Sequence, residues 1–540
     1  MPNLFKKSNS TILVTLLILV GSFLRLYQIG SLPGSFSPDE VAQGYTAYSI
    51  LQTGQDEWGN SNLLSLRSFG DFKLPFQTLL MIPFISLFGL TTSAVRLPAA
   101  IIAILSLPLF YLLTQRLFPR SKIIPILGLA MFSLSTWHLP LSRLALEAQI
   151  VIFFLLSTLF LYQTKYRWLS LLTYTLSILT YHSATYVFPL LIVVLFVFHR
   201  SFRHRFYLIA FISISFLTYL YLPNQRSSDI AIFHPTDNWQ SVSDQRFLLT
   251  QGHLPDTISR LISNKAVYSL KITLHHLVSY LSPQFLVTQG VDETTYGLLP
   301  GFGVLGYIVA FGFYFSLLYI IANPQVRLLL ICLLVTFIPS ALAKGNFPGN
   351  RLSLSLPFFL WLSAIGWQSI IQSLPRRFAK VVPVFTILIF LFETFSYLAV
   401  YFFSGNVILA DGLLYGRQQL FDYLSRQPYQ HLHISRTLSQ PQAYYLFFNR
   451  LDPHIVQSAS PSWLEYQQQG KQFLDQLSDY RLPNVTFGDI KTEYLSQPGT
   501  ITVYTSRDNI YTPYDQAIYH PSPLDPKPII FIKNNVSASP

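Results

Sequence analysis

The sequence predicts a polytopic α-helical membrane protein that ends in a small α/β domain. Three observations carry this prediction: a low charged fraction, long apolar runs over the first three quarters of the chain, and a change of composition near residue 405. Only 11% of the 540 residues are charged and 51% are hydrophobic, whereas soluble proteins carry about 25% charged residues. This composition excludes a soluble enzyme, a disordered chain and, despite the net charge of +12, a nucleic-acid-binding protein.

Apolar runs long enough to cross a hydrocarbon core of about 30 Å recur from the N-terminus to residue 403. We expect about eleven transmembrane helices. Their approximate ranges are 11–29, 94–115, 123–139, 148–163, 169–183, 185–198, 206–222, 299–321, 328–343, 352–372 and 381–403. The first run has no small-x-small cleavage site and is expected to be an anchor. Cys332, the only cysteine, lies in an apolar run and excludes a disulfide framework.

The distribution of charge orients these spans. If the N-terminus is cytoplasmic, the loops on that side contain fourteen basic residues and no Asp or Glu. The basic residues are Lys6, Lys7, Arg116, Arg120, Lys122, Lys165, Arg167, Arg200, Arg203, Arg205, Arg327, Arg376, Arg377 and Lys380. Such a bias is typical of cytoplasmic loops. We therefore expect the N-terminus inside and the C-terminus outside, with outer loops at 30–75 and 223–297.

The last part of the chain has a different character. Residues 405–540 contain ten basic and eleven acidic residues, with Asp, Gln, Ser and Pro between the aromatic residues. Short β-like runs occur at His431–Ser435, Ile501–Tyr504 and Ile529–Ile532. We predict a membrane module over 1–404 and an extracytoplasmic soluble domain over 405–540. An amphipathic stretch, Ile258–Tyr280, is expected in the second outer loop.

The first outer loop contains an acidic pair at the start of a helix. Ser37-Pro38-Asp39-Glu40 places proline at the first helical position and matches the S-x-x-E capping box. On these four residues alone, capping is the favoured interpretation, because Asp39 and Glu40 also suit the positive end of the helix dipole. The alternative is a reactive carboxylate at the membrane surface.

Other ionisable residues recur at the outer ends of the spans. They are Asp56, Glu57, Asp71, Lys73, Arg96, Arg143 and Glu147. Charged groups at membrane depth are costly and are functional candidates for that reason. Two structural alternatives stand beside this one: Lys73 and Arg96 snorkel to lipid headgroups, and Arg143 forms an i,i+4 helix pair with Glu147. Glu393, inside the last span, has no assigned role.

With these residues in this order, the stretch from Phe36 to Ala100 resembles the bacterial phospholipid-carrier-dependent glycosyltransferases of the protein O-mannosyltransferase and aminoarabinose-transferase type (glycosyltransferase family 39), which have the GT-C membrane fold. The resemblance extends over roughly residues 10–405. The shared features are the Asp39-Glu40 pair, the Tyr45–Gly54 helix, Asp56-Glu57 with Gly59, Lys73 with Pro75, Arg96–Pro98, Ser142-Arg143 with Glu147, Tyr181-His182-Ser183, Ser282–Leu286, and Asn350-Arg351 with Pro357.

The resemblance implies transfer of a sugar, with inversion, from a polyprenyl-phosphate donor to an acceptor hydroxyl. The acceptor needs a carboxylate to take its proton, and the resemblance assigns this role to Asp39, with Glu40 holding the helix start or orienting the acceptor. The departing lipid phosphate needs cations. The candidates for that role are Lys73, Arg96, Arg143 and Arg351. Further site candidates are Asp71, Glu147 and His182.

The resemblance also implies the partners and the location. The partners are a polyprenyl-phosphate-linked sugar, an acceptor protein, glycan or lipid, and membrane lipids, with the active site on the outer face of the cytoplasmic membrane. No cofactor is assigned, and a divalent metal ion is left open. Its candidate ligands are Asp71, His253, His275 and His276. Some relatives have an acid directly before the lysine, where this chain has Phe72.

Two other functions compete with the transferase. One is a flippase or transporter of lipid-linked sugars, and the other is a polysaccharide polymerase or ligase. Transporters usually show repeated halves and polar residues near the membrane midplane, whereas here no repeat is visible and the polar residues gather at one face. A polymerase or ligase would not need the acidic pair directly after the first span.

Overall fold

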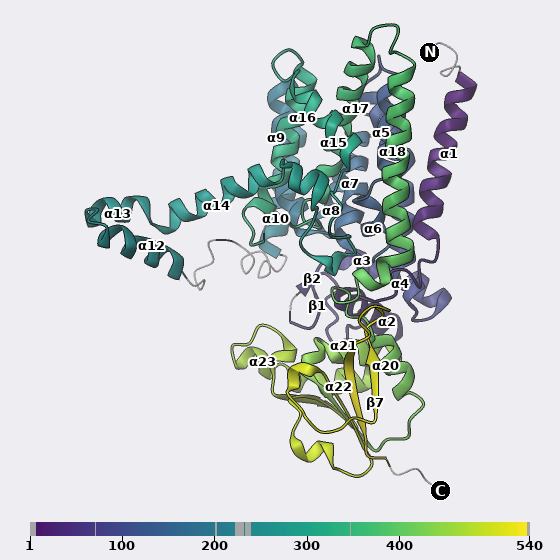
Figure 1. The fold of residues 1–540 in the computed structure, drawn as a ribbon, viewed down its shortest axis with the longest axis vertical. Coiled ribbons are helices and arrows are strands. Elements are labelled where there is room, and N and C mark those ends of the chain that lie inside the picture. The colour runs from purple at the N-terminus through teal and green to yellow at the C-terminus, as the bar shows by residue number, and fades with distance from the viewer. Residues whose placement is uncertain are drawn as a thin grey trace.

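The computed structural model describes residues 7–70, 72–199, 202–221, 232, 239–345 and 347–536. Figure 1 shows three parts: a bundle of helices, a sheet domain at one end of the bundle, and an arm of helices at its side. The bundle helices are α1 (Lys7–Leu26), α3 (Pro75–Phe88), α4 (Thr92–Leu117), α5 (Ile123–Ser133), α6 (His138–Ser142), α7 (Glu147–Tyr162), α8 (Leu169–Ile178), α9 (His182–His199), α10 (Phe202–Tyr221), α15 (Tyr307–Leu317), α16 (Pro324–Ala341), α17 (Leu356–Ser373) and α18 (Val381–Ala399).

Within the described ranges, four helical segments are long and apolar enough to cross a membrane: Thr92–Leu117, Pro324–Ala341, Ser353–Ser373 and Val381–Ile408. Eight shorter apolar helices of 10–17 residues accompany them. Each of the eleven predicted spans overlaps one of these helices. The sequence reading did not predict α3, which packs against α4. The number of membrane crossings and their orientation stay predictions.

Two residues that sequence reasoning singled out have structural roles. The Cys332 thiol is buried in α16. Glu393 in α18 accepts hydrogen bonds from the backbone N–H groups of Tyr307 and Ile308, at 3.1 and 3.4 Å. Those are the first two residues of α15, so the carboxylate caps the positive end of that helix from a neighbouring one.

The arm follows α10 in the chain and contains α12 (Gln240–Gln251), α13 (Asp256–Ile262) and α14 (Lys265–Ser279). The predicted amphipathic stretch is thus helical, but it is divided between α13 and α14. The break falls at Asn264, whose side-chain oxygen accepts a hydrogen bond from the Val267 N–H at 3.0 Å and caps the start of α14.

The sheet domain contains six strands in the order β4-β5-β3-β6-β8-β7. Their bounds are β3 (His431–Ser435), β4 (Asp479–Leu482), β5 (Val485–Gly488), β6 (Thr500–Tyr504), β7 (Gln516–Tyr519) and β8 (Pro528–Asn534). The central strand β3 is parallel to both neighbours, with Leu432 opposite Val485 and Ile501, and the outer pairs are antiparallel. The three strands predicted from sequence are confirmed as β3, β6 and β8. The helices of this domain are α20 (Arg417–Leu424), α21 (Pro441–Phe448), α22 (Pro453–Trp463) and α23 (Glu465–Gln468).

One further helix, α2 (Pro38–Thr53), joins the bundle to the sheet domain. Its residues Val41 and Tyr45 belong to the same buried apolar cluster as Leu432 and Phe487 of the sheet. The chain then forms a short antiparallel ribbon of β1 (Leu66–Arg67) and β2 (Phe72–Lys73). The helical part of the predicted first outer loop therefore packs against the sheet domain.

Candidate active site at the start of helix α2

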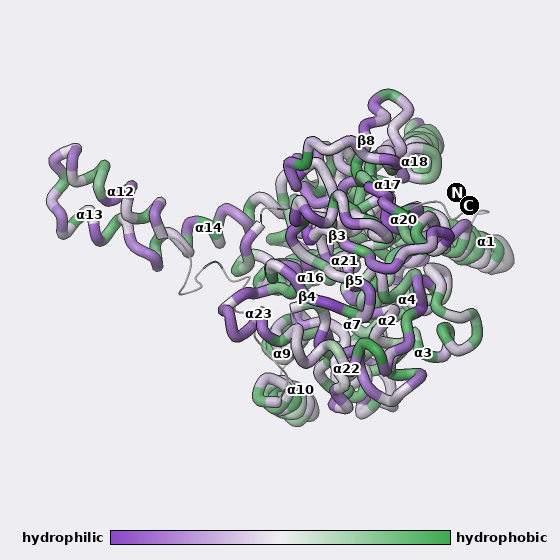
Figure 2. The backbone as a smooth tube through the Cα atoms, turned by 90° about the horizontal axis from the view of Figure 1, so that it is seen from below, coloured by the Kyte–Doolittle hydropathy of each residue, from purple (hydrophilic) through white to green (hydrophobic). Residues whose placement is uncertain are grey.

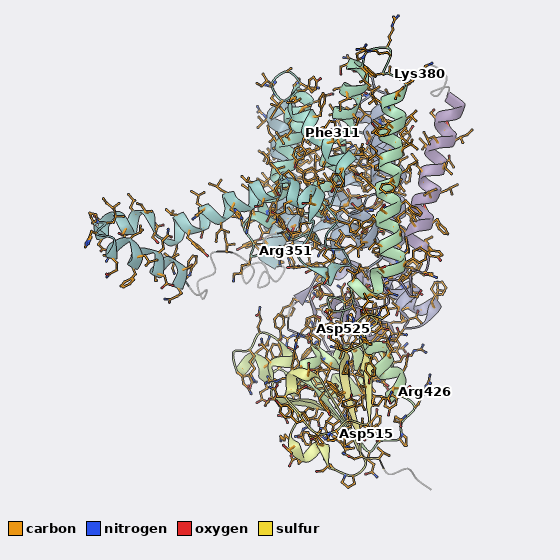
Figure 3. The ribbon with its side chains drawn as sticks, viewed as in Figure 1. Phe311, Arg351, Lys380, Arg426, Asp515 and Asp525 are labelled. Carbon is orange, nitrogen blue, oxygen red and sulfur yellow. The ribbon has the colours of Figure 1, made fainter. Side chains whose placement is uncertain are left out.

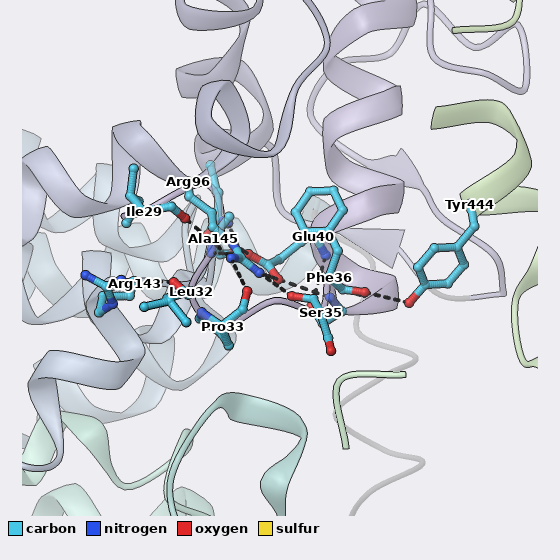
Figure 4. Close-up of polar contacts among 12 residues, drawn as sticks. Ile29, Leu32, Pro33, Ser35, Phe36, Glu40, Arg96, Arg143, Ala145 and Tyr444 are labelled. Atoms are coloured by element: carbon cyan, nitrogen blue, oxygen red, sulfur yellow. Dashed lines mark hydrogen bonds and ion pairs between the residues drawn. The ribbon is translucent and has the colours of Figure 1, made fainter. Parts of the chain in front are cut away.

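The start of α2 is fixed by the capping box that the sequence predicts. The Ser37 hydroxyl accepts a hydrogen bond from the Glu40 N–H at 3.3 Å, and Glu40 Oε2 accepts one from the Ser37 N–H at 3.1 Å. Pro38 occupies the first helical position. Glu40 thus serves the cap, and Figure 4 shows it beside Arg96 and Ala145.

Asp39 forms an ion pair with Lys73. The distance from Lys73 Nζ to Asp39 Oδ1 is 2.7 Å. The β1–β2 ribbon positions the lysine, because Lys73 pairs with Leu66 in register. The Lys73 side chain is 4% exposed and that of Asp39 is 25% exposed. Asp39 is therefore an acid that solvent reaches, beside a cation that is nearly buried.

Glu40 and Arg96 form a second ion pair that is fully buried. Arg96 Nε and Nη2 donate to Glu40 at 2.8 and 3.2 Å, and both side chains are 0% exposed. Glu40 Oε1 also accepts from the Ala145 N–H at 3.0 Å. Arg96 donates further to the carbonyl oxygens of Pro33 at 2.9 Å and Ser35 at 2.6 Å. The contacts of Arg96 in this structure hold the turn before α2 against α4.

Arg143 is held in a similar way. Its guanidinium donates to the carbonyl oxygens of Leu24 and Tyr27, both at 2.7 Å, and of Leu32 at 3.0 Å. The side chain is fully buried. The alternative that Arg143 pairs with Glu147 within one helix is wrong, because α6 ends at Ser142 and α7 begins at Glu147. A role of Arg96 or Arg143 in binding the donor phosphate stays a prediction.

Two residues of α2 and α21 complete the polar contacts around the helix start, and sequence reasoning missed both. Gln43 lies one turn after Asp39 and donates to Glu147 Oε1 at 2.8 Å. Its position four residues after Asp39 is a signal that could have found it. Tyr444 of α21 donates its hydroxyl to the Phe36 carbonyl at 2.7 Å, and no local pattern marks a contact between residues so far apart in sequence.

The remaining candidates are Arg351 and His182. Arg351 is half-buried after α16 and donates to the Lys344 carbonyl at 2.9 Å. Figure 3 shows Arg351 near the sheet-domain end of the bundle and Lys380 at the opposite end. His182 is the first residue of α9 and is half-buried.

The metal-ligand candidates are dispersed. His253 and His275 are exposed on the arm, whereas His276 is buried, with Nδ1 3.1 Å from the Ala341 carbonyl oxygen. Asp71 lies outside the described residues. Among the residues that are described, no three His, Cys, Asp or Glu side chains come together as a metal site. A divalent ion held through Asp71 stays a prediction.

The second acidic pair, Asp56-Glu57, lies where α2 meets the sheet domain. Asp56 Oδ1 accepts hydrogen bonds from the N–H groups of Trp58 and Asn60, at 3.0 and 2.8 Å. Glu57 lines a cavity of about 20 Å³, enough for one water molecule. Burial, and secondarily the charge of Asp56, raise the pKa of Glu57 to about 8. This pair is therefore part of the junction between α2 and the sheet domain.

No protein-family model and no curated protein sequence matches the chain. Solved structures match it in fold. ArnT, the aminoarabinose transferase of Cupriavidus metallidurans, bound to undecaprenyl phosphate, aligns over 97% of this chain and 98% of its own, with 13% sequence identity and a TM-score of 0.50. In the apo state the same protein aligns over 98% of both chains, with 12% identity and a TM-score of 0.49.

A second kind of protein also aligns with the chain. The oligosaccharyltransferase AglB of Archaeoglobus fulgidus, in complex with an inhibitory peptide and a dolichol-phosphate, aligns over 80% of this chain and 62% of its own, with 14% identity and a TM-score of 0.45. The alignment with undecaprenyl-phosphate-bound ArnT includes the helical bundle and the sheet domain together. The chain therefore has the GT-C fold of membrane glycosyltransferases.

Proposed function

We propose that the protein is an integral-membrane glycosyltransferase that moves a sugar, with inversion, from a polyprenyl-phosphate donor to an acceptor hydroxyl on the outer face of the cytoplasmic membrane. The observation that carries the proposal is the Asp39–Lys73 pair, with 2.7 Å between Nζ and Oδ1 and a partly exposed carboxylate. A base that reaches solvent beside a nearly buried cation provides the two groups that this transfer needs. The fold agrees with this function, since a solved relative in fold binds undecaprenyl phosphate.

Asp39 acts as the general base in this proposal. Its carboxylate takes the proton of the acceptor hydroxyl as the acceptor oxygen attacks the anomeric carbon from the face opposite the phosphate. The bond between the anomeric carbon and the phosphate oxygen breaks, and its electron pair leaves with the polyprenyl phosphate. The sugar is thus transferred with inversion, and Asp39 afterwards releases the proton to water.

Lys73 stabilises the phosphate in the same step. In the structure the Lys73 ammonium forms an ion pair with Asp39. A donor phosphate that binds beside it is a second anion and competes with Asp39 for the ammonium. When Lys73 turns to the phosphate, Asp39 loses a hydrogen bond and becomes a stronger base. Donor binding and activation of the base are therefore coupled through one lysine. Arg351, near the same end of the bundle, is the proposed second phosphate ligand.

Glu40 and Arg96 are positioning residues in this scheme. Their buried pair and the bond from Ala145 to Glu40 fix the first turn of α2 and thereby the direction of the Asp39 side chain. Sites held by packed neighbours react faster, since little reorganisation is left for the reaction itself. A direct transfer assay identifies the acceptor class, whether protein, glycan or lipid.

Substitution of Asp39 by Asn tests the proposal. Asp39→Asn keeps the shape and removes the base, so transfer from labelled polyprenyl-phosphate sugars should fall by about 10²–10⁴-fold, while the carrier lipid still binds. Asp525→Asn is the matched control, because Asp525 is an exposed acid of the sheet domain. Full transfer by Asp39→Asn would remove Asp39 as the base, and a panel of sugar donors with the wild type would identify the sugar and where it goes.

A further inference from the structure

The arm carries a row of apolar side chains that the protein itself leaves uncovered. In α14 the row consists of Val267, Leu270, Leu274 and Val278, which are between 40% and 70% exposed. Their spacing of three, four and four residues puts them on one face of the helix. The two preceding helices, α12 and α13, also carry apolar side chains that are between 42% and 73% exposed: Phe247, Leu248, Ile258, Leu261 and Ile262. Exposed apolar side chains gathered on one helix face in this way indicate a partner.

The base of the arm is fixed to the bundle. His276 Nδ1 lies 3.1 Å from the Ala341 carbonyl oxygen, and the Tyr280 hydroxyl donates to the Ser340 carbonyl at 3.1 Å. Both contacts join the last turn of α14 to the end of α16. The buried His276 lies on the helix face opposite the apolar row. The orientation of the row is therefore set by the bundle.

The direction of the arm agrees with a membrane surface. Figure 1 shows α14 running outward from the side of the bundle, across the direction of α18 and α9. Figure 2 shows α12 and α13 far beyond the outline of the bundle. If the bundle helices cross a bilayer, an element perpendicular to them lies parallel to the bilayer plane.

The charge of the arm complements anionic lipid headgroups. Residues 240–279 contain four basic side chains and two acidic ones, a net charge of +2. Exposed Lys271 flanks the apolar row of α14. Lys265 Nζ lies 4.9 Å from the centre of the Trp239 ring, which meets Tyr268 edge to face at 5.8 Å. Trp, Tyr and Lys together are the usual residues at the interface between lipid and water.

We propose that the arm lies in the interfacial layer of the leaflet nearer the sheet domain, with the apolar row of α14 against acyl chains and Lys271 among anionic headgroups. The arm thereby widens the membrane-bound footprint on one side of the bundle. Its base is joined to the end of α16, and Arg351 follows α16 in the chain before η3 (Ser353–Ser355). The inference rests on the proposed membrane placement of the bundle and not on the transfer chemistry.

Site-directed fluorescence in proteoliposomes tests this placement. The buried Cys332 is replaced by Ser, and an environment-sensitive fluorophore is attached to the full chain at one of three exposed positions. Leu270→Cys reports on the arm, Phe392→Cys on the outward face of α18, and Arg426→Cys on the sheet domain (Figure 3). Vesicles contain phosphatidylcholine and phosphatidylglycerol, with either a spin label high on the lipid chain or iodide in the water as quencher.

At Leu270→Cys we expect severalfold stronger quenching by the lipid label than at Arg426→Cys, and protection from iodide. Replacing Lys271 by Glu should weaken the lipid quenching at Leu270→Cys in anionic vesicles and have less effect in pure phosphatidylcholine. Iodide quenching at Leu270→Cys equal to that at Arg426→Cys would overturn the proposal, and so would protection from both quenchers, which means that protein covers the row. Absence of lipid quenching at Phe392→Cys would instead contradict the membrane placement of the bundle.

Discussion

Glu40 and Asp39 are adjacent in sequence, yet they occupy opposite environments. Glu40 is fully buried and accepts hydrogen bonds from Arg96, Ser37 and Ala145, whereas Asp39 is 25% exposed and pairs with Lys73. A buried carboxylate with this many donors is held firmly in place. A partly exposed carboxylate paired with a cation can exchange that partner. The same four-residue motif thus contains a structural acid and the acid that we propose as the base.

The first prediction concerns the buried pair. Arg96→Met leaves the Glu40 carboxylate buried without its cation, and loss of one member of such a pair costs about 3–5 kcal/mol. We expect a marked fall in the melting temperature of the detergent-solubilised protein. Lys73→Met is the comparison. Its partner Asp39 reaches water, so this variant should show a smaller fall in melting temperature. An unchanged melting temperature together with lost donor binding would instead make Arg96 a phosphate ligand, as the sequence suggested.

The second prediction concerns Lys73. Lys73→Met removes the proposed phosphate contact and should lower kcat/KM for the donor by about 10²–10³-fold, with a raised KM and weaker binding of polyprenyl phosphate alone. Lys73→Arg keeps the charge and should restore part of both. A raised KM would show that Lys73 does more than stabilise the fold, because a folding defect lowers the fraction of active protein without changing the KM of the molecules that remain folded.

Local sequence patterns predicted the parts of the site that depend on neighbouring residues. The start of α2, its capping box and the strands β3, β6 and β8 follow from proline, serine and apolar runs, and the structure has all of them. The partners of Arg96 and Arg143 were not predictable, since they are mostly backbone carbonyls of the turn at residues 24–35. Charged residues can be read from a sequence, but the positions of backbone carbonyl groups in the fold cannot.

The third prediction concerns the contact between the sheet domain and the start of α2. Tyr444→Phe leaves the Phe36 carbonyl without its buried donor, at a cost of about 1–3 kcal/mol. Because Phe36 precedes the capping box, we expect a lower kcat with a nearly unchanged KM for the donor. Tyr511→Phe, at a 94% exposed tyrosine of the same domain, should change neither. If Tyr444→Phe keeps the full kcat, this contact has a structural role only.

The fourth prediction is a pH dependence of stability at the junction that contains Glu57. Its pKa in the folded protein is raised to about 8, from an ordinary value of 4.5, mainly by burial. Between these two values the unfolded chain has released the proton and the folded chain still holds it. The unfolded state therefore binds fewer protons, and stability falls as the pH rises through this range. Burial raises the pKa of neighbouring Asp56 as well, so the two effects have the same sign.

Thermal unfolding between pH 5 and 8 measures this effect, with the range set by the ordinary and raised pKa values of Glu57. The melting temperature of the wild type should fall across the range, and that of Glu57→Gln should fall less, because an amide has no proton to lose on unfolding. Glu57→Gln should consequently be the more stable protein at the alkaline end. Glu465→Gln, at an exposed acid of the sheet domain, should follow the wild type. Parallel curves for Glu57→Gln and the wild type would mean that Glu57 is already ionised in the folded protein, and a cation would then have to lie against its buried carboxylate.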